Sequence, residues 1–416
     1  MNQFHFLFLN IDIYYFIQHM KRLRLFETES QYETAKGEFE YPTVSYVEDT
    51  DTVHYMEKPD PSKEYLTFEA LENGTFTYMI CYGDDSEGET TVYARAKLQY
   101  SFNGEDWFDW ARPHETSESI TVLANQKLYV RGYTQSINDF YGTIKFSSTC
   151  RFNVCGLLSS LLYGYDYADE DFIWTKQPIK RGHFSSLFIN CDKLISAENL
   201  ILPQELAQGC YCAMFQGCTS LTTVPELPAT AITLATQCYD SMFYGCTSLT
   251  TAPELPATTL ATYCYQSMFF GCTALTTAPV LPATILTIGC YNSMFKGCTA
   301  LTTAPELPAT TLADTCYANM FNGCTALTTA PVLPATSLYK CYGCYNNMFQ
   351  GCSNLNYIKA MFTTSPSTSE YTYNWVSGVA ATGTFVKNSA APWNATGVNT
   401  GVNGVPSGWT VQTASA

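Results

Sequence analysis

The chain has 416 residues, 46% of them hydrophobic and 15% aromatic, so it is long enough for two or three domains with packed cores. Only 14% of the residues are charged, and the formal net charge is −16. A chain of this charge repels phosphate groups, which argues against nucleic acid as a partner.

Residues 1–60 predict an N-terminal arm that attaches the protein to a partner. The apolar stretch at 4–17 is shorter than a membrane-spanning helix requires, and Asn10 and Asp12 interrupt it. Its basic residues follow the stretch instead of preceding it, which makes it a poor secretory signal. We therefore expect no membrane span and expect translation to begin at Met20 rather than at the first methionine.

Residues 61–155 predict a β-sandwich. Hydrophobic side chains alternate with period two from Tyr65 to Val154, as they do in half-buried strands. Asn-Gly and Gly-Asp sequences separate the strands, and Asn-Gly tolerates the positive φ that hairpins need. About seven short strands of this kind are typical of an Ig-like sandwich.

Residues 61–155 contain few side chains that suggest ligand binding or catalysis. The acidic residues of 84–89 lack the EF-hand spacing, so we expect a solvated loop rather than a calcium site. Trp107, Phe108 and Trp110 offer rings for a sugar, although most aromatics of a sandwich lie in its core. No histidine has an acidic or nucleophilic neighbour that suggests catalysis, so we predict no enzyme, no metal and no cofactor.

After a connector at 156–182, repeats fill residues 183–355. Six copies of Cys-Tyr-x-x-Met-Phe-x-Gly-Cys alternate with segments such as Thr-Thr-Ala-Pro-x-Leu-Pro-Ala-Thr, at a period of 26 to 28. A unit this short buries its apolar face only against its neighbours, which predicts a solenoid. Residues 183–194 fit the pattern in degenerate form, with His183 in the first cysteine position, and predict the first of seven turns. Residues 356–416 predict a C-terminal cap.

One repeat predicts one short helix and one strand. Cys264 and Met268 are four residues apart and so share a face of a helical turn, which Gly271 ends. A strand of inward residues follows and ends at Pro282. Two columns remain to face solvent or a partner, and we predict binding there. The first column is Glu226, Glu254, Val280, Glu306 and Val332, and the second is Thr250, Thr276, Thr302 and Thr328.

The 18 cysteines predict buried thiols, because free cysteine behaves as a small hydrophobe. The predicted core ladder is Cys218, Cys246, Cys272, Cys298, Cys324 and Cys352. Some disulfides or a metal site stay open as alternatives. Cys341 and Cys344 form a C-x-x-C pair, but no second pair stands at zinc-like spacing, so we interpret the pair as a chance occurrence.

The repeats resemble the BspA-like, Treponema-type leucine-rich repeats. The match is clearest from Leu301 to Cys324, and it covers about residues 183 to 360. Two departures are a longer period and Cys316-Tyr317 with Met320-Phe321, where family members often have Gly and Ala-Phe. The segments at 24–28, 46–50 and 404–410 resemble sequences attached to such repeats in gut Bacteroidetes and their tailed phages. The resemblance implies surface display and adhesion without catalysis.

We therefore predict an α+β protein: an Ig-like sandwich followed by a capped leucine-rich-repeat solenoid with short helices and strands. The predicted function is that of a phage virion component, a fibre or decoration protein that contacts host-surface protein or glycan through the solenoid. The arm would bind other virion or surface proteins, and a homo-oligomer is possible. The alternatives are a secreted or cell-surface adhesin of a gut bacterium, an accessory module of a glycan-active protein, and a structural spacer.

Overall fold

The computed structural model describes residues 22–26, 43–47, 52–56, 65–80, 82–84, 90–92, 94–111, 117–136, 144–165, 174–176, 178–228, 233–363, 369–393 and 401–414. The chain divides into two units, residues 1–64 and 65–416. The first unit contains the strands β1 (Arg22–Phe26), β2 (Thr43–Val47) and β3 (Thr52–Met56). These strands form one sheet, in which β2 pairs parallel to β1 and antiparallel to β3.

The second unit begins with two sheets. Its elements are β4 (Leu66–Ala70), β5 (Gly74–Ile80), β6 (Tyr82–Asp84), β7 (Thr90–Val92), β8 (Ala94–Ser101), β9 (Phe108–Asp109), β10 (Ile120–Val122), β11 (Lys127–Ser136), β12 (Ile144–Ser148), β13 (Phe152–Leu157), the 3₁₀ helix η2 (Leu158–Leu161), β14 (Tyr163–Tyr165), β15 (Trp174–Lys176), β16 (Leu194–Ser196), β17 (Leu200–Ile201), β18 (Tyr357–Ala360), α4 (Ser369–Thr372), β19 (Thr384–Lys387) and β20 (Thr410–Thr413). The larger sheet has the order β16-β13-β4-β11-β8-β9, and the smaller has the order β10-β5-β12.

Aromatic side chains join these two sheets. Phe68 of β4 lies 4.9 Å from Phe76 of β5 and 5.0 Å from Phe146 of β12, measured between ring centroids. All three rings are buried. Such ring pairs contribute beyond their buried area, so the two sheets share one core. The strand-rich character expected from the alternating pattern is present, and the Ig-like topology stays a prediction.

The same core continues into the first repeat. The strands β16 and β17 belong to that repeat, and both pair parallel with β13 of the larger sheet. The N–H of Phe146 donates to the carbonyl of Leu187 at 2.9 Å, and the ring of Phe188 stacks on that of Phe146 at 5.9 Å. The sheets therefore cover the end of the repeats that would otherwise expose apolar side chains.

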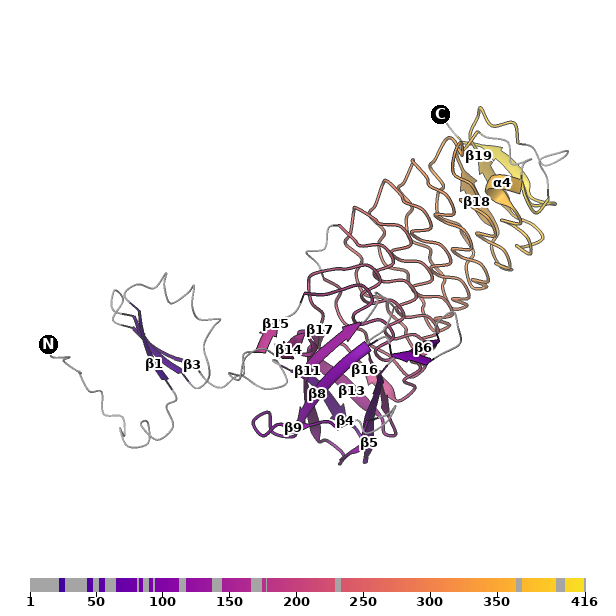
Figure 1. Ribbon diagram of the computed structural model, residues 1–416. Helices are drawn as coiled ribbons and strands as arrows, with labels where there is room; N and C mark the ends of the chain where they lie inside the picture. Colours follow the sequence, from indigo (N-terminus) through magenta and orange to yellow (C-terminus); the bar gives the residue numbers. More distant parts are fainter. Residues whose placement is uncertain are drawn as a thin grey trace. The chain divides into compact units, whose positions relative to one another are not determined.

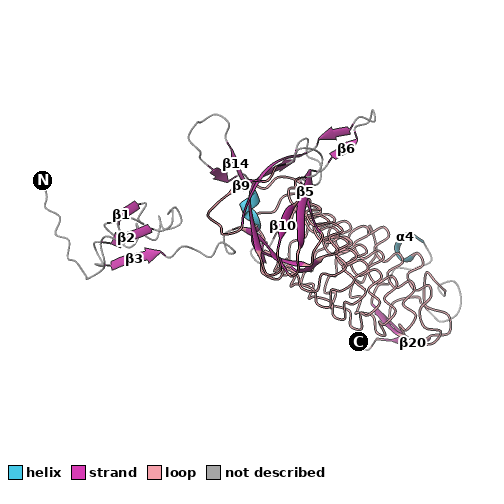
Figure 2. Ribbon diagram, turned by 90° about the horizontal axis from the view of Figure 1, so that it is seen from below, coloured by secondary structure: helices cyan, strands magenta, loops and turns pink. Residues whose placement is uncertain are grey.

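Each repeat forms one coil, and the coils stack in a row between the sheets and β18 (Figures 1 and 2). A coil has a turn segment, such as 261–272, and a proline segment, such as 276–284. Within the turn segment, every second N–H donates to the carbonyl three residues earlier, at 3.0 to 3.3 Å for 264 to 272. The intervening N–H groups donate to the next coil at 2.7 to 3.1 Å. This ladder of backbone bonds holds the coil stack together.

The predicted helical turn is wrong, because the turn segment is a run of consecutive β-turns. Tyr263, Ser267 and Gly271 have φ of 55°, 52° and 71°, so every fourth residue is left-handed. A right-handed helix excludes that conformation, whereas a turn with positive φ at its third residue requires it. Among the described residues, helix is confined to the two four-residue elements η2 and α4. The α+β prediction therefore overstated the helical content.

The predicted strand in each repeat is reduced to isolated bridges. Thr277 bridges Thr251 and Thr303 in the neighbouring coils, but no continuous ladder extends beyond it. Pro279 and Pro282 follow within five residues, and proline has no N–H to donate to a ladder. The prolines that mark the repeat thus also prevent a full sheet on this side.

Turn segments of the same kind continue after Leu355. The N–H groups of Tyr345, Phe349 and Gly351 donate to carbonyls of residues 371, 375 and 377, at 2.7 to 2.9 Å. Trp375 is buried in the phenylalanine position of this additional coil, and its indole N–H donates to Gly404 at 2.9 Å. The parallel sheet β18-β19-β20 and the buried rings of 393 and 409 complete this end.

Candidate binding surface

The two columns predicted from the sequence lie on the proline segments, and their side chains are exposed. The structure places Glu226, Glu254, Val280, Glu306, Val332, Thr250, Thr276, Thr302 and Thr328 at the surface. Val280 is 77% exposed and Val332 is 47% exposed, two coils apart in the same column. Thr302 donates its hydroxyl to the carbonyl of Thr276 at 3.4 Å, so some threonines also join neighbouring coils.

A second surface, the turn face, lies on the turn segments. It consists of the three residues of each coil that precede a left-handed residue, and these residues stack from coil to coil through the backbone bonds. Its first column is Gln208, Thr236, Thr262, Ile288, Asp314 and Tyr342; its second is Cys212, Asp240, Gln266, Asn292, Ala318 and Asn346; its third is Gln216, Tyr244, Phe270, Lys296, Asn322 and Gln350. All are at least partly exposed except Asp240 and Ala318.

Variation among the repeats is concentrated on the turn face. Each of its columns holds five residue types in six copies, whereas the buried Cys, Tyr, Met and Phe positions and the half-buried Gly position beside them are identical in all six. The Glu/Val column of the proline segments holds two types in five copies. Buried positions are held constant by packing, so the free choice at the turn face leaves it available for recognition.

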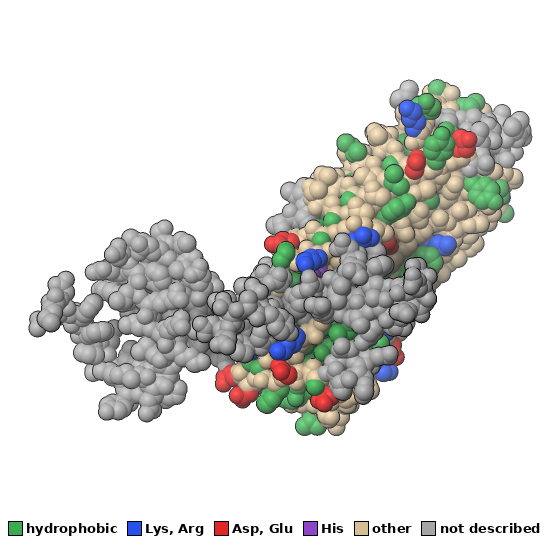
Figure 3. Space-filling model, viewed as in Figure 1, with side chains coloured by type: hydrophobic (Ala, Val, Ile, Leu, Met, Phe, Trp, Pro, Cys, Tyr) green, Lys and Arg blue, Asp and Glu red, His purple; other side chains and the backbone are tan. Residues whose placement is uncertain are grey.

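Side chains of the third column contact one another along the stack. The rings of Tyr244 and Phe270 stack at 4.5 Å, and the Lys296 ammonium lies 5.3 Å from the Phe270 ring centroid. Further along, the Asn322 amide donates to Gln350 at 2.8 Å. The column therefore presents a cluster of two aromatic rings and one cation, followed by a pair of amide groups. Charged groups are sparse on the visible face of the coil stack (Figure 3).

The sequence analysis missed the turn face because it predicted a short helix here from the core positions alone and placed the binding columns on the following segment. The available signal was the comparison of the six copies with one another, position by position. Residue 216, in Met-Phe-x-Gly-Cys, differs from its equivalents at 244, 270, 296 and 322. Ser or Asn and then Gly recur four residues apart in the turn segments, and Asn and Gly tolerate positive φ. This spacing would have indicated turns.

The six Gly-Cys cysteines are fully buried, and each joins two coils. The thiol of Cys272 donates to the carbonyl of Phe243 in the preceding coil at 3.1 Å, and the other five do the same at 2.9 to 3.2 Å. Burial raises the pKa of the Cys272 thiol to about 12, so it stays protonated and able to donate. None of the described cysteines forms a disulfide. The role of these thiols is to pack in the core and to join neighbouring coils by hydrogen bonds.

The aromatic and acidic residues considered for sugar or calcium binding have structural surroundings. Trp110 is buried against Tyr78, at 5.2 Å between ring centroids, and so belongs to the core. The Arg131 guanidinium covers one face of Trp107 at 4.0 Å, while Phe108 is 52% exposed. The side chains of the acidic loop at 84–89 lie outside the described residues.

His183 is buried in the first turn segment, in contact with the sheets. Its Nε2 lies 3.0 Å from the Thr134 hydroxyl of β11. Desolvation lowers the pKa of the imidazole to about 4, and the nearby Lys180 ammonium lowers it further. A neutral, buried imidazole at this contact fits the structural role that the repeat pattern predicts.

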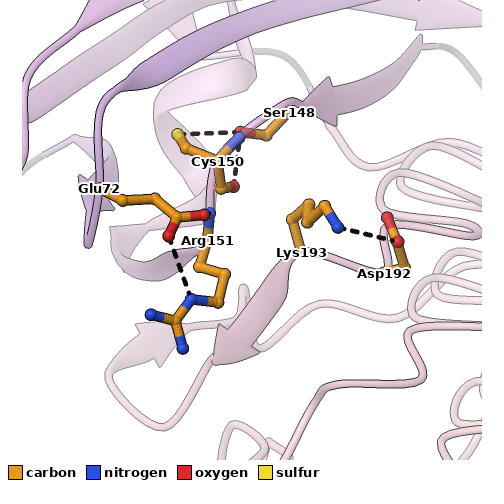
Figure 4. A network of polar contacts seen from close by, with 6 residues as sticks. All are labelled: Glu72, Ser148, Cys150, Arg151, Asp192 and Lys193. Atoms are coloured by element: carbon orange, nitrogen blue, oxygen red, sulfur yellow. Dashed lines mark hydrogen bonds and ion pairs between the residues drawn. The ribbon is translucent and has the colours of Figure 1, made fainter.

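Exposed polar contacts also mark the junction of the sheets with the first coil (Figure 4). The Arg151 Nε lies 3.3 Å from a Glu72 carboxylate oxygen, and the Arg151 backbone N–H donates to the same carboxylate at 2.9 Å. This backbone bond lowers the pKa of Glu72. Lys193 pairs with Asp192 at 3.4 Å, and both are well exposed. Such surface pairs contribute little to stability and position no reactive group.

Across the ranges that the structure describes, no three potential metal ligands converge, and no helix has the length and apolarity to cross a bilayer. Residues 185–328 and 265–374 match the model of the BspA type leucine rich repeat region, which accounts for six copies. No curated protein and no solved structure matches the chain. The matched region makes the coil stack similar to repeats that serve in protein binding and adhesion at surfaces.

Proposed function

We propose that this chain is a non-enzymatic binding protein in which the coil stack is a capped solenoid and the turn face recognises a host-surface protein or glycan. The observation that carries the proposal is the variation among repeats, which is largest in the three mostly exposed columns of the turn face, while the buried Cys, Tyr, Met and Phe positions between them are identical. A backbone ladder fixes these columns in register, so recognition costs little conformational entropy. The aromatic, amide and hydroxyl groups there resemble those that paratopes use.

The proline segments are the alternative recognition surface within the same function. Val280 at 77% exposure and Val332 at 47% are the observations that favour it, because an apolar side chain this exposed has little packing role. The nine residues predicted from the sequence belong to this alternative.

We further propose display on a virion. Two features support it: the resemblance of the flanking segments to those attached to such repeats in gut Bacteroidetes and their tailed phages, and the thiols, which form no disulfides. A protein whose many described cysteines form no disulfide suits assembly in a reducing cytoplasm. The sandwich would then act as the N-terminal cap of the solenoid, and the segment before Glu64 would attach the chain to the particle.

Proteomics of purified virions beside the secreted fraction of the host tests this placement. Peptides of the chain in the particle support the virion proposal. Peptides only in the secreted fraction would replace it with a bacterial adhesin and leave the binding proposal intact. A labelled full-length chain that binds no strain of a gut Bacteroidetes panel, measured by flow cytometry, would contradict recognition of a host surface.

A further inference from the structure

The first turn of each turn segment places two side chains together. In all six copies the N–H of the first core cysteine donates to the carbonyl three residues earlier, at 3.1 to 3.3 Å. The residues at that earlier position are Ala207, Ala235, Ala261, Thr287, Ala313 and Cys341. Among these six copies, only the last, with Cys341 and Cys344, therefore has a cysteine at both ends of this turn.

The geometry of that turn suits a disulfide. Residues three apart in a β-turn have Cα atoms less than about 7 Å apart, and disulfides span Cα separations of about 4.4 to 6.8 Å. Gly343 at the third position has φ of 63°, as such a turn requires. The sulfur atoms of Cys341 and Cys344 already lie in contact, at 2.8 Å.

The pair also lies beside a surface loop. Cys341 and Cys344 are buried, but Tyr339 is 75% exposed and Tyr342 is 59% exposed. Opening of this short loop would bring Cys341 to solvent and would break the bonds of Tyr342 to the preceding coil, which are its N–H to the Asp314 carboxylate and the Thr315 N–H to its carbonyl, both at 2.8 Å. Tyr342 belongs to the first column of the turn face, so a bond here would fix part of that surface.

We propose that Cys341 and Cys344 are a disulfide-forming site that a disulfide oxidant, such as oxidised glutathione, closes after the protein leaves a reducing compartment. The Cys341 thiolate attacks one glutathione sulfur and releases one glutathione thiolate. The Cys344 thiolate then attacks the Cys341 sulfur and releases the second. Two thiols lose two protons and two electrons, and oxidised glutathione becomes two reduced glutathiones. Loop opening sets the rate, because a buried thiol reacts slowly.

The test uses the full-length chain, purified reduced and then equilibrated in glutathione buffers of increasing oxidised fraction. Intact mass and non-reducing peptide mapping report the bond. We expect the wild type to lose two hydrogen atoms and to yield a linked peptide containing residues 341 and 344. Cys341→Ala, which places there the residue found in four other copies, folds and loses none. Cys272→Ala, in the buried ladder, retains the bond.

A gain of function completes the test. Ala313→Cys creates the same turn with Cys316, whose N–H donates to residue 313 at 3.3 Å, so this variant gains a second linked peptide. A wild type that stays reduced after prolonged exposure and after refolding in the oxidising buffer overturns the proposal. So does a bond that persists in Cys341→Ala. Neither result depends on the proposed binding function.

Discussion

Two adjacent phenylalanines test the architecture of the turn segment. Phe269 is fully buried, with Phe243 and Phe295 stacked on its two faces at 5.7 Å each. Phe270 is partly exposed in the third column of the turn face. Alanine substitution of a buried Phe costs about 3–5 kcal/mol, and the loss of two ring stacks places Phe269→Ala in the upper part of that range. Phe270→Ala is expected to cost about 1 kcal/mol or less.

Urea unfolding of both variants, followed by circular dichroism, measures this difference. Hydrogen exchange should place the loss of protection in Phe269→Ala on the coils around residues 243, 269 and 295, because each coil contacts only its neighbours. Equal destabilisation by the two substitutions, or a uniform loss of protection along the chain, would refute the assignment of alternating buried and exposed pairs.

Three further predictions concern buried and strained groups. Tyr239→Phe should leave the free energy of unfolding unchanged or raise it by up to about 1 kcal/mol, because the Tyr239 hydroxyl is buried with no hydrogen-bond partner. Tyr211→Phe should lower it by about 1 kcal/mol, because the 2.9 Å bond to the carbonyl of residue 203 is lost. Thermal unfolding measures both variants, and the opposite order of stability would contradict this. Gly271→Ala should cost about 1 kcal/mol, since φ is 71°, and Ser267→Gly, where φ is 52°, should not destabilise; a neutral Gly271→Ala would argue against the left-handed turn. The pKa of His183 is lowered from 6.5 to about 4, so its contribution to stability is present above pH 6.5 and is lost as pH falls toward 4. The free energy of unfolding falls by up to about 3 kcal/mol over this range, at about 1.4 kcal/mol per pH unit. Urea midpoints between pH 4 and 7 should therefore fall less steeply in His183→Gln than in the wild type, and identical slopes would refute this.

The sequence predicted which side chains are buried better than it predicted their conformation. Cys264, Met268 and Gly271 recur at intervals of three or four, which a helix and a run of four-residue turns satisfy almost equally. The difference lies in the left-handed residues, and Tyr263 occupies one of them without being a residue that usually signals positive φ. The weak bridges of Thr277 depend on contacts between coils, which no local pattern contains.

The candidate surface was predictable only in part. Exposure of Val280 and Glu306 followed from the alternation around the prolines. The turn face required knowing that residues 262, 266 and 270 stack into columns, which depends on the backbone ladder between coils. The two sheets and the first coil share one core because β16 pairs parallel with β13, and these strands lie about forty residues apart. This contact was not predictable from either segment alone.

The most direct test of recognition through the turn face compares two variants built from residues that the repeats already accept. One changes Tyr244, Phe270 and Lys296 to Gln, as at 216 and 350 in the same column; the other changes Val280 and Val332 to Glu. Binding of each full-length chain to a host strain that the wild type binds is measured by flow cytometry titration. Recognition through the turn face predicts at least a tenfold loss of affinity, about 1.4 kcal/mol, for the first variant and little change for the second. Unchanged binding by the first variant with a comparable loss in the second would contradict it and assign recognition to the proline segments.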